Sequence, residues 1–153
     1  MKGLDQIDKQ ILSLLQENSR ITNKELSEKL GLSTTPIFER VKKLEKSGLI
    51  KKYVAILDRK VAGKGLLAIS AVILKHHSKA LIESFIKKIE ALPEVLECYH
   101  TTGKSDFLMK IAVADMDEYQ DFIVNKLSAI DEVANLETSF VMSEIKNSTS
   151  LQL

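Results

Sequence analysis

Hydrophobic residues in the first fifty positions recur at the three- and four-residue spacing of amphipathic helices. Five apolar residues share one face of a first predicted helix: Leu4, Ile7, Ile11, Leu14 and Leu15. This helix is expected to end near Asn18. A second, shorter helix is expected to follow Thr22, which can form a reciprocal capping pair with Glu25, and to end at Gly31. Ser33 is then placed to cap a third helix.

The third predicted helix has a divided surface. Its buried stripe is Ile37, Val41 and Leu44. The opposite face is polar and mostly basic, and comprises Thr34, Thr35, Glu39, Arg40, Lys42, Lys43 and Lys46. A short helix, a glycine turn and a second helix with a basic outer face form the layout of a helix-turn-helix. A solvated basic face is the alternative, but the combination favours DNA binding.

Each polar residue of this helix has an expected role on DNA. The N-terminal end of such a helix points at base edges, so Thr34 and Thr35 are expected to read bases or bind phosphates. Arg40 is expected to bind a guanine edge through two hydrogen bonds. The remaining cations, Lys42, Lys43 and Lys46, are better suited to phosphate charge.

The segment after Gly48 changes from helical to strand-type composition. Its apolar and β-branched residues are Ile50, Tyr53, Val54, Ile56 and Leu57, which predict a strand leaving the helical unit. The glycines and cations of residues 59–65 then predict a hinge.

The remainder of the chain repeats itself. Residues 65–95 align with residues 103–133 at an offset of 38, which matches Lys88 to Lys126 and "LPEV" to "IDEV". Each copy contains a strand-like run, a helical run and a second strand-like run. Two strand–helix–strand units in series predict a ferredoxin-like βαββαβ domain, and the whole chain is therefore expected to be of the α+β class.

A sheet of this kind covers only one face with its two helices. A second copy of the chain is the expected partner for the other face, which predicts a homodimer. A helix-turn-helix on each subunit of that dimer predicts a two-fold symmetric DNA site.

The junction between the two copies is "TTGKSDF", residues 101–107. Its hydroxyls, lysine and aspartate offer donors, acceptors and both charges, which suffice to hold a small zwitterion. The alternative is a plain hairpin turn in which Gly103 supplies an unusual dihedral and Asp106 accepts from nearby backbone amides. The residues alone favour the turn.

Charge and composition add limits to these predictions. Residues 1–60 hold 13 Lys+Arg against 8 Asp+Glu, whereas residues 61–153 hold 9 against 13, so the basic excess lies in the N-terminal part. No run of eighteen apolar residues is present, the start does not resemble a secretory signal, and the single cysteine, Cys98, permits no intrachain disulfide. A cytoplasmic protein is expected.

Three motifs together resemble a known family. The "LDxxDxxIL" start, the "LSxxxxxxRVxxLExxGxI" helix and the "GxxD" turn are similar to those of Lrp/AsnC-type regulators, also called feast/famine proteins, and the leucine-responsive members are the nearest in character. The similarity covers nearly the whole chain.

This resemblance implies a division into a DNA-binding domain at residues 1–49, a strand and hinge linker at 50–64, and an effector-binding and oligomerisation (RAM-type) domain at 65–153. It implies a cytoplasmic, nucleoid-associated transcription regulator that binds palindromic promoter DNA as a homodimer, commonly within an octamer of four dimers. It also implies an amino-acid effector and no other cofactor or metal. The residues implied in effector binding are Thr101, Thr102, Gly103, Lys104 and Asp106. The resemblance also implies that Ser33 contacts DNA.

Two other functions compete with that of a regulator. An enzyme is disfavoured because no nucleophile with a base, metal motif or phosphate loop is recognisable; surface or packed positions are expected for His76, His77 and His100, and a core position for Cys98. A DNA-organising protein of low sequence specificity is the closer alternative, since lysines on phosphates would serve it equally well.

Overall fold

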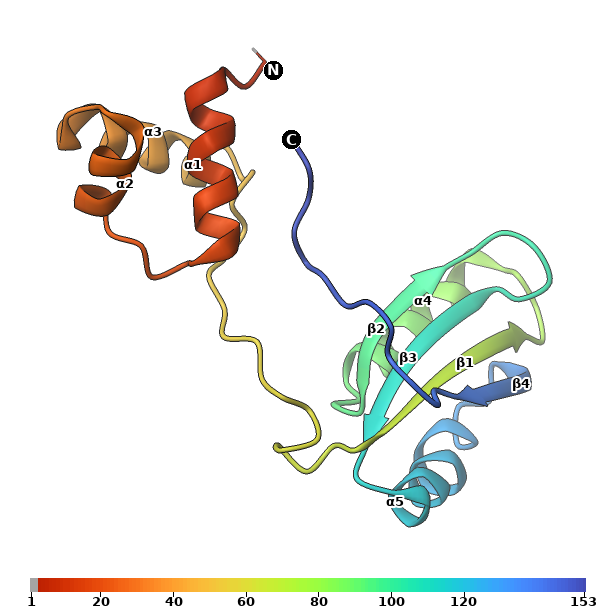
Figure 1. Ribbon diagram of the computed structural model, residues 1–153. Coiled ribbons are helices and arrows are strands. Elements are labelled where there is room, and N and C mark those ends of the chain that lie inside the picture. The colour runs from red at the N-terminus through yellow and green to blue at the C-terminus, as the bar shows by residue number, and fades with distance from the viewer. Residues whose placement is uncertain (1–2) are drawn as a thin grey trace. The chain divides into compact units, whose positions relative to one another are not determined.

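The computed structural model describes residues 3–153, which form two compact units (Figure 1). The first comprises the chain up to Ile56 together with the tail Lys146–Leu153, and the second is Leu57–Ile145. The chain therefore passes from one unit to the other twice. The functional division into residues 1–49, 50–64 and 65–153 stays a prediction beside this division by packing.

The first unit contains the three predicted helices, α1 (Gln6–Glu17), α2 (Asn23–Leu30) and α3 (Thr34–Lys46). Their ends follow the capping residues: the Asp5 side chain accepts from the Asp8 amide, and Thr22 and Glu25 form the reciprocal capping box. Gly31 ends α2 in the left-handed region, with φ of 65°. The buried core of the unit is Ile11, Leu12, Leu26, Ile37 and Leu44.

The C-terminal tail belongs to this first unit because it is held by α1. The Leu151 amide donates to Oε1 of Gln16 at 2.7 Å, and Nε2 of Gln16 donates back to the Leu151 carbonyl at 3.1 Å. A side-chain amide thus pairs with both polar groups of one backbone residue. The last residues of the chain are consequently tied to α1.

The strand predicted after Gly48 is not formed. Residues 51–58 are neither helix nor strand, and within residues 3–153 no backbone–backbone hydrogen bond is made by residues 51–57. A strand needs a neighbour for its backbone groups, and the described chain supplies none here. Tyr53 anchors the segment to the end of α3, because its hydroxyl donates to Glu45 at 2.9 Å and its pKa is raised to about 12 by burial and that carboxylate.

The predicted hinge is a hydrogen-bonded turn. The Asp58 side chain accepts from the amides of Lys60 and Val61, and the Arg59 guanidinium donates to the carbonyls of Lys64 and Gly65. The absence of a strand at 51–57 and the order at 58–65 place the least bonded part of the linker before residue 58.

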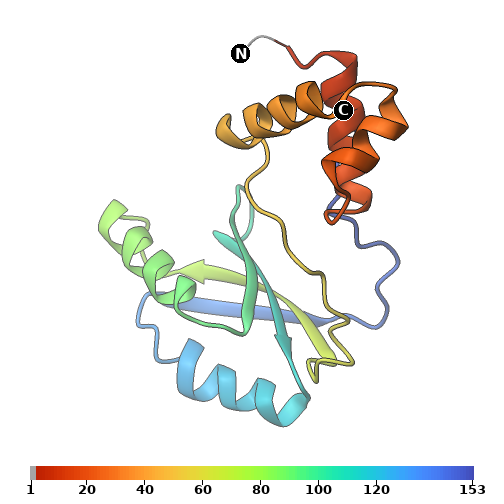
Figure 2. The ribbon, with the colours of Figure 1, turned by 90° about the vertical axis from the view of Figure 1, so that its left-hand side faces the viewer.

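The second unit has the predicted βαββαβ order. Its elements are β1 (Leu66–Leu74), α4 (Lys79–Glu90), β2 (Val95–His100), β3 (Phe107–Val113), α5 (Met116–Asp121), η1 (Phe122–Leu127) and β4 (Val133–Phe140). The strands form one antiparallel sheet in the order β2-β3-β1-β4, and the helices run alongside it (Figure 2). This is the ferredoxin-like arrangement, so the predicted α+β fold is confirmed.

One continuous core joins the helices to one face of the sheet. Alternate residues of β1 and β3 enter it, including Val72, Phe107 and Met109, and they meet Phe85 of α4 and Phe122 of η1. Alternation within each strand directs the intervening side chains to the opposite face.

The internal repeat is visible as two reciprocal ion pairs. Glu132 accepts from Lys88 at 2.7 Å, and its repeat counterpart Glu94 accepts from Lys126, so each copy's helix lysine pairs with the other copy's glutamate. Lys88 and then the Ser84 hydroxyl lower the pKa of Glu132 to about 2. These pairs hold the loop after each helix against the helix of the other copy.

The helical run of the second repeat copy is not a single α-helix. From Phe122 to Leu127 it is a π-helix, and the Ser128 amide bonds the Ile123 carbonyl five residues back. The extra residue per turn shifts the apolar side chains that follow, and both Phe122 and Leu127 remain buried. Composition gives little warning of such a bulge.

Candidate functional site

The start of α3 presents hydroxyl groups to solvent. Ser33 occupies the N-cap position, but its side chain makes no capping hydrogen bond. Thr34 and Thr35 follow it on an exposed first turn, with Thr34 Oγ1 at 3.4 Å from Ser27 Oγ of α2. The turn from α2 is fixed by Gly31 and by the Leu32 amide, which bonds the Ser27 carbonyl. A rigid turn therefore sets the direction in which these hydroxyls point.

Three exposed lysines continue along the outer face of α3. Lys42, Lys43 and Lys46 are exposed, and none of them has an ion-pair partner among residues 3–153. A row of unpaired cations beside exposed hydroxyls is the composition expected of a surface that binds a polyanion.

Arg40 does not lie on that face, and its placement there is corrected. It stands three residues after buried Ile37 and four before buried Leu44, which puts it on the flank of the inner stripe. Its Nη1 donates to Asp5 Oδ2 and to Asp8 Oδ1, each at 2.6 Å. Asp5 is the N-cap of α1 and Asp8 lies in its first turn, so Arg40 links α3 to the first helix of the unit.

The electrostatics support this linking role. Asp8 is buried at 6% exposure, and an isolated carboxylate there would be costly without a cation. The pKa of Asp5 is lowered by the Asp8 backbone amide first and by Arg40 second, and the two aspartates raise the pKa of Arg40. Arg40 would have to leave two ion pairs before it could read a guanine, and its direct base contact stays an untested prediction.

Phe38 is a feature of this surface that sequence reasoning missed. It is 45% exposed, four residues after Thr34 and four before Lys42, and Lys42 Nζ lies 5.5 Å from the centre of its ring. The sequence did contain a sign of its exposure, because Phe38 is an aromatic residue that lies outside the three-and-four spacing of the apolar stripe.

The turn at residues 101–106 is closed by its own backbone. The Thr101 amide bonds the Asp106 carbonyl, the Thr101 hydroxyl bonds the Ser105 carbonyl, and Gly103 has φ of 121°. Thr102 and Lys104 are exposed on this turn. The expected unusual dihedral of Gly103 is therefore present, and the Thr101 hydroxyl is engaged within the turn.

Asp106 is held by two partners, one at the end of β1 and one in the segment that follows it. Its Oδ2 accepts from the Leu74 amide at 2.8 Å, and its Oδ1 lies 2.8 Å from Nε2 of His77. The Leu74 hydrogen bond, followed by His77, lowers the pKa of Asp106, and 19% of the side chain remains exposed. Neither partner lies in the turn itself: Leu74 is 32 residues and His77 is 29 residues away in the sequence.

The other residues considered for chemistry lie apart. His100 stacks on Phe107 with ring centres 4.6 Å apart. Cys98 is exposed on the edge strand β2 and is not the core residue expected, because no further strand covers that edge. Across residues 3–153 no group of three or more His, Cys, Asp or Glu could hold a metal ion.

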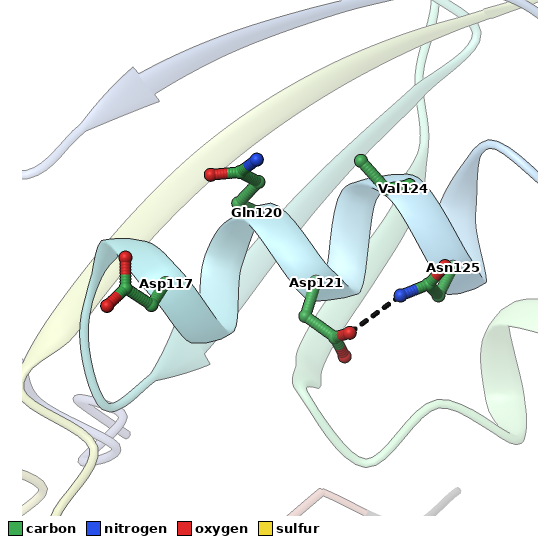
Figure 3. Close-up of a pocket in the computed structure, with 5 residues that line it drawn as sticks. All are labelled: Asp117, Gln120, Asp121, Val124 and Asn125. Atoms are coloured by element: carbon green, nitrogen blue, oxygen red, sulfur yellow. Dashed lines mark hydrogen bonds between the residues drawn. The ribbon is translucent and has the colours of Figure 1, made fainter.

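A shallow surface hollow lies on the outer side of α5 and η1 (Figure 3). It is lined by Asp117, Gln120, Asp121, Val124 and Asn125, and Asn125 donates to Asp121 at 2.6 Å. None of the predicted site residues lines it. Over the described part of the chain, no helix has the length and apolar character needed to cross a membrane.

The chain matches two families in succession. Residues 4–51 match a winged helix-turn-helix DNA-binding family, and residues 67–151 match the Lrp/AsnC ligand binding domain. A leucine-responsive regulatory protein of Haemophilus influenzae is 41% identical over 99% of this chain and 92% of its own length. The Bacillus subtilis transcriptional regulator AzlB is 38% identical over 98% of this chain and 96% of its own.

Solved structures agree with these sequence matches. A transcriptional regulator from Neisseria meningitidis in complex with L-Met has a TM-score of 0.93 at 38% identity, covering 97% of this chain and 96% of that one. Escherichia coli AsnC has a TM-score of 0.89 at 31% identity, covering 97% and 98%. The relatives are named as regulators of transcription and not as enzymes.

Proposed function

The chain belongs to the Lrp/AsnC family of transcriptional regulators, and we propose that an amino acid bound at the Asp106 turn controls how its helix-turn-helix units hold palindromic DNA. It is a regulator with a DNA-binding domain and a small-ligand-binding domain. The observation that carries the proposal concerns the two oxygens of the Asp106 carboxylate. One accepts from the Leu74 backbone amide, which is fixed in β1, and the other pairs with the His77 side chain, which a ligand can displace.

The DNA-binding surface is the outer face of α3. Ser33, Thr34 and Thr35 contact base edges or phosphates at the start of the helix, and the unpaired cations Lys42, Lys43 and Lys46 bind phosphates. Arg40 supports this surface by fixing α3 to α1. Preformed exposed donors of this kind need no internal bond to be broken before they meet the groove.

The effector is a free amino acid whose ammonium takes the place of His77 at Asp106 Oδ1. The Leu74 amide keeps Oδ2 in position during that exchange, so the carboxylate stays aligned. Exposed Thr102 and Lys104 provide a hydroxyl and a cation for the effector's carboxylate, while Gly103 permits the turn. The Neisseria meningitidis regulator, whose structure contains L-Met, supports an amino acid as the ligand class.

A homodimer completes the second unit. The face of the sheet away from the helices carries partly exposed apolar side chains, among them Ile69, Tyr99 and Leu108. Residues 51–57 make no backbone–backbone hydrogen bond within residues 3–153, and three apolar side chains of this segment, Val54, Ile56 and Leu57, are more than half exposed. A second copy covers both features, and it places two helix-turn-helix units on a two-fold DNA site.

Control acts through assembly. Four dimers form an octamer with the effector held between dimers, and binding changes the relative free energy of assemblies that space the DNA-binding units differently. The protein acts in the cytoplasm on nucleoid DNA.

A calorimetric screen of the twenty amino acids, each with and without a duplex selected by the protein, tests this function. One or a few amino acids should bind, and the same ones should shift DNA affinity. A protein that binds selected and scrambled duplexes equally, with no effect of any amino acid, would instead be a DNA-organising protein of low specificity.

A further inference from the structure

An aromatic ring stands exposed on the surface that faces DNA. Phe38 is 45% exposed although it is flanked in the sequence by buried Ile37 and by Glu39, which points outward. Its ring makes no contribution to the buried core of Ile11, Leu12, Leu26, Ile37 and Leu44. Single exposed apolar side chains are common on protein surfaces, so what gives Phe38 meaning is its position within the proposed DNA-binding face.

The neighbours of Phe38 identify the kind of partner. Thr34 lies one turn before it and Lys42 one turn after it, so the ring stands between a hydroxyl at the reading end and a phosphate-binding cation. Lys42 Nζ lies 5.5 Å from the ring centre, a cation–π contact that keeps the two side chains together. The unpaired positive charge around the ring matches a DNA backbone and disfavours a hydrophobic protein surface.

The chemistry of the major groove narrows the contact further. Of the four bases only thymine carries an apolar group, its C5 methyl, on the major-groove edge. A side chain in the N-terminal half of a recognition helix reaches that edge. Phenylalanine has no hydrogen-bonding group with which to read any other base.

From this combination we infer that Phe38 is a specificity-determining residue that packs against the C5 methyl group of a thymine in each half-site, with Lys42 holding the ring in place. The inference rests on the proposed function and deepens it, because it names the base read by one residue. It assigns to α3 an apolar reading contact beside the hydroxyl and lysine contacts.

Thymine and uracil differ only by that methyl group, which gives a direct test. The full-length protein first selects duplexes from a random-sequence library, and each thymine of the selected site is then replaced by uracil, one symmetric pair at a time. At one pair, wild-type affinity should fall about 4-fold per half-site and about 15-fold for both, the value of a buried methyl group.

The variants separate reading from folding. Phe38→Ala should bind the thymine and uracil forms of that pair equally, while Phe38→Leu should keep part of the difference. The matched control, Lys43→Ala on the same helix, should lose affinity equally on both duplexes and keep the wild-type ratio. Urea unfolding of Phe38→Ala should match that of the wild type within about 1 kcal/mol, because the ring lies outside the core.

Two results would overturn the inference. If the wild type shows no thymine-to-uracil ratio at any position of a selected site, or if Phe38→Ala keeps the wild-type ratio, Phe38 does not read the methyl while the proposed function stands. If the library yields no preferred sequence at all, both the inference and sequence-specific regulation are wrong.

Discussion

The two candidate sites treat their charges in opposite ways. On the outer face of α3 the lysines have no ion-pair partner within residues 3–153, and the hydroxyl of Ser33 is not used as a cap. In the second unit the key carboxylates are all paired, Asp106 with His77, Glu132 with Lys88 and Glu94 with Lys126. Under the proposed function, DNA meets groups that are already available, whereas an effector would have to exchange partners at Asp106.

This difference assigns DNA affinity to the unpaired cations of α3 and control by a ligand to the paired carboxylate Asp106. Unpaired surface cations gain most of their binding energy by releasing counterions, so binding by α3 needs no change within the protein. A ligand that displaces an internal partner is coupled to whatever that partner holds, here the segment between β1 and α4. The paired site is the one suited to a switch.

The largest expected effect is at Asp106. Asp106→Ala should lower amino-acid affinity by about 3 kcal/mol, because a charge-assisted hydrogen bond is lost and the Leu74 amide is left without its acceptor. DNA affinity without effector should change little. Isothermal titration with the amino acid found in the screen measures both.

Asp106→Asn is the matched control for that substitution. It keeps an acceptor for the Leu74 amide and removes only the charge, so it should fold like the wild type and still fail to bind the ammonium. A normal effector response in both variants would place the effector elsewhere.

The next effect concerns the paired charges of the repeat. Glu132→Gln should lower the free energy of unfolding by about 2 kcal/mol at neutral pH, because Lys88 and Ser84 stabilise the carboxylate. Lys88 is 44% exposed, so solvent screening reduces the value from what the pKa alone suggests.

The difference in unfolding free energy between the wild type and Glu132→Gln should depend on pH, because the pKa of Glu132 is lowered in the folded state. The folded-state pKa of Glu132, about 2, lies below the ordinary 4.5, so the stabilisation is complete above about pH 5 and lost as pH falls toward 2. Urea unfolding of wild type and Glu132→Gln across this range should converge at the acid end. A gap that stays constant with pH would show that charge at this position is not the cause.

Arg40→Ala comes third and should act on stability. Removing the guanidinium leaves buried Asp8 without its cation, so the free energy of unfolding should fall by about 1 to 2 kcal/mol. DNA affinity measured well below the unfolding midpoint should then keep its base preference. A selective loss at one guanine, with unchanged stability, would restore Arg40 as a base-reading residue.

The smallest effect is expected at an unpaired lysine. Lys43→Ala should leave unfolding unchanged and reduce the salt dependence of DNA binding by about one unit of logarithmic slope, equally on all sequences. Filter binding at several salt concentrations measures the slope. An altered sequence preference in this variant would move Lys43 from the phosphates to the bases.

Much of the fold could be predicted because its signals are local. The capping pair Thr22–Glu25, the left-handed Gly31 and the 38-residue repeat each depend on residues close together or on a fixed offset, and the structure has all of them. The resemblance to Lrp/AsnC regulators, also read from short motifs, is confirmed by the two family matches.

What could not be predicted depends on distant or missing partners. His77 follows the end of β1 and meets Asp106 just before the neighbouring strand β3, and the spacing of the two residues in the sequence does not predict this contact. The strand predicted after Gly48 does not form, because residues 51–57 find no backbone partner within residues 3–153. Arg40 is different, since its distance of three from Ile37 and four from Leu44 already favoured the inner flank.

The most direct test of the central claim is one comparison of DNA affinities. The affinity of the full-length wild type for its selected duplex and for a scrambled duplex is measured with and without the amino acid found in the screen, beside Asp106→Asn. The account predicts a preference of at least about 4 kcal/mol for the selected duplex, shifted by the amino acid in the wild type and unshifted in the variant. Equal affinity for both duplexes, or the same amino-acid shift in the variant, would contradict it.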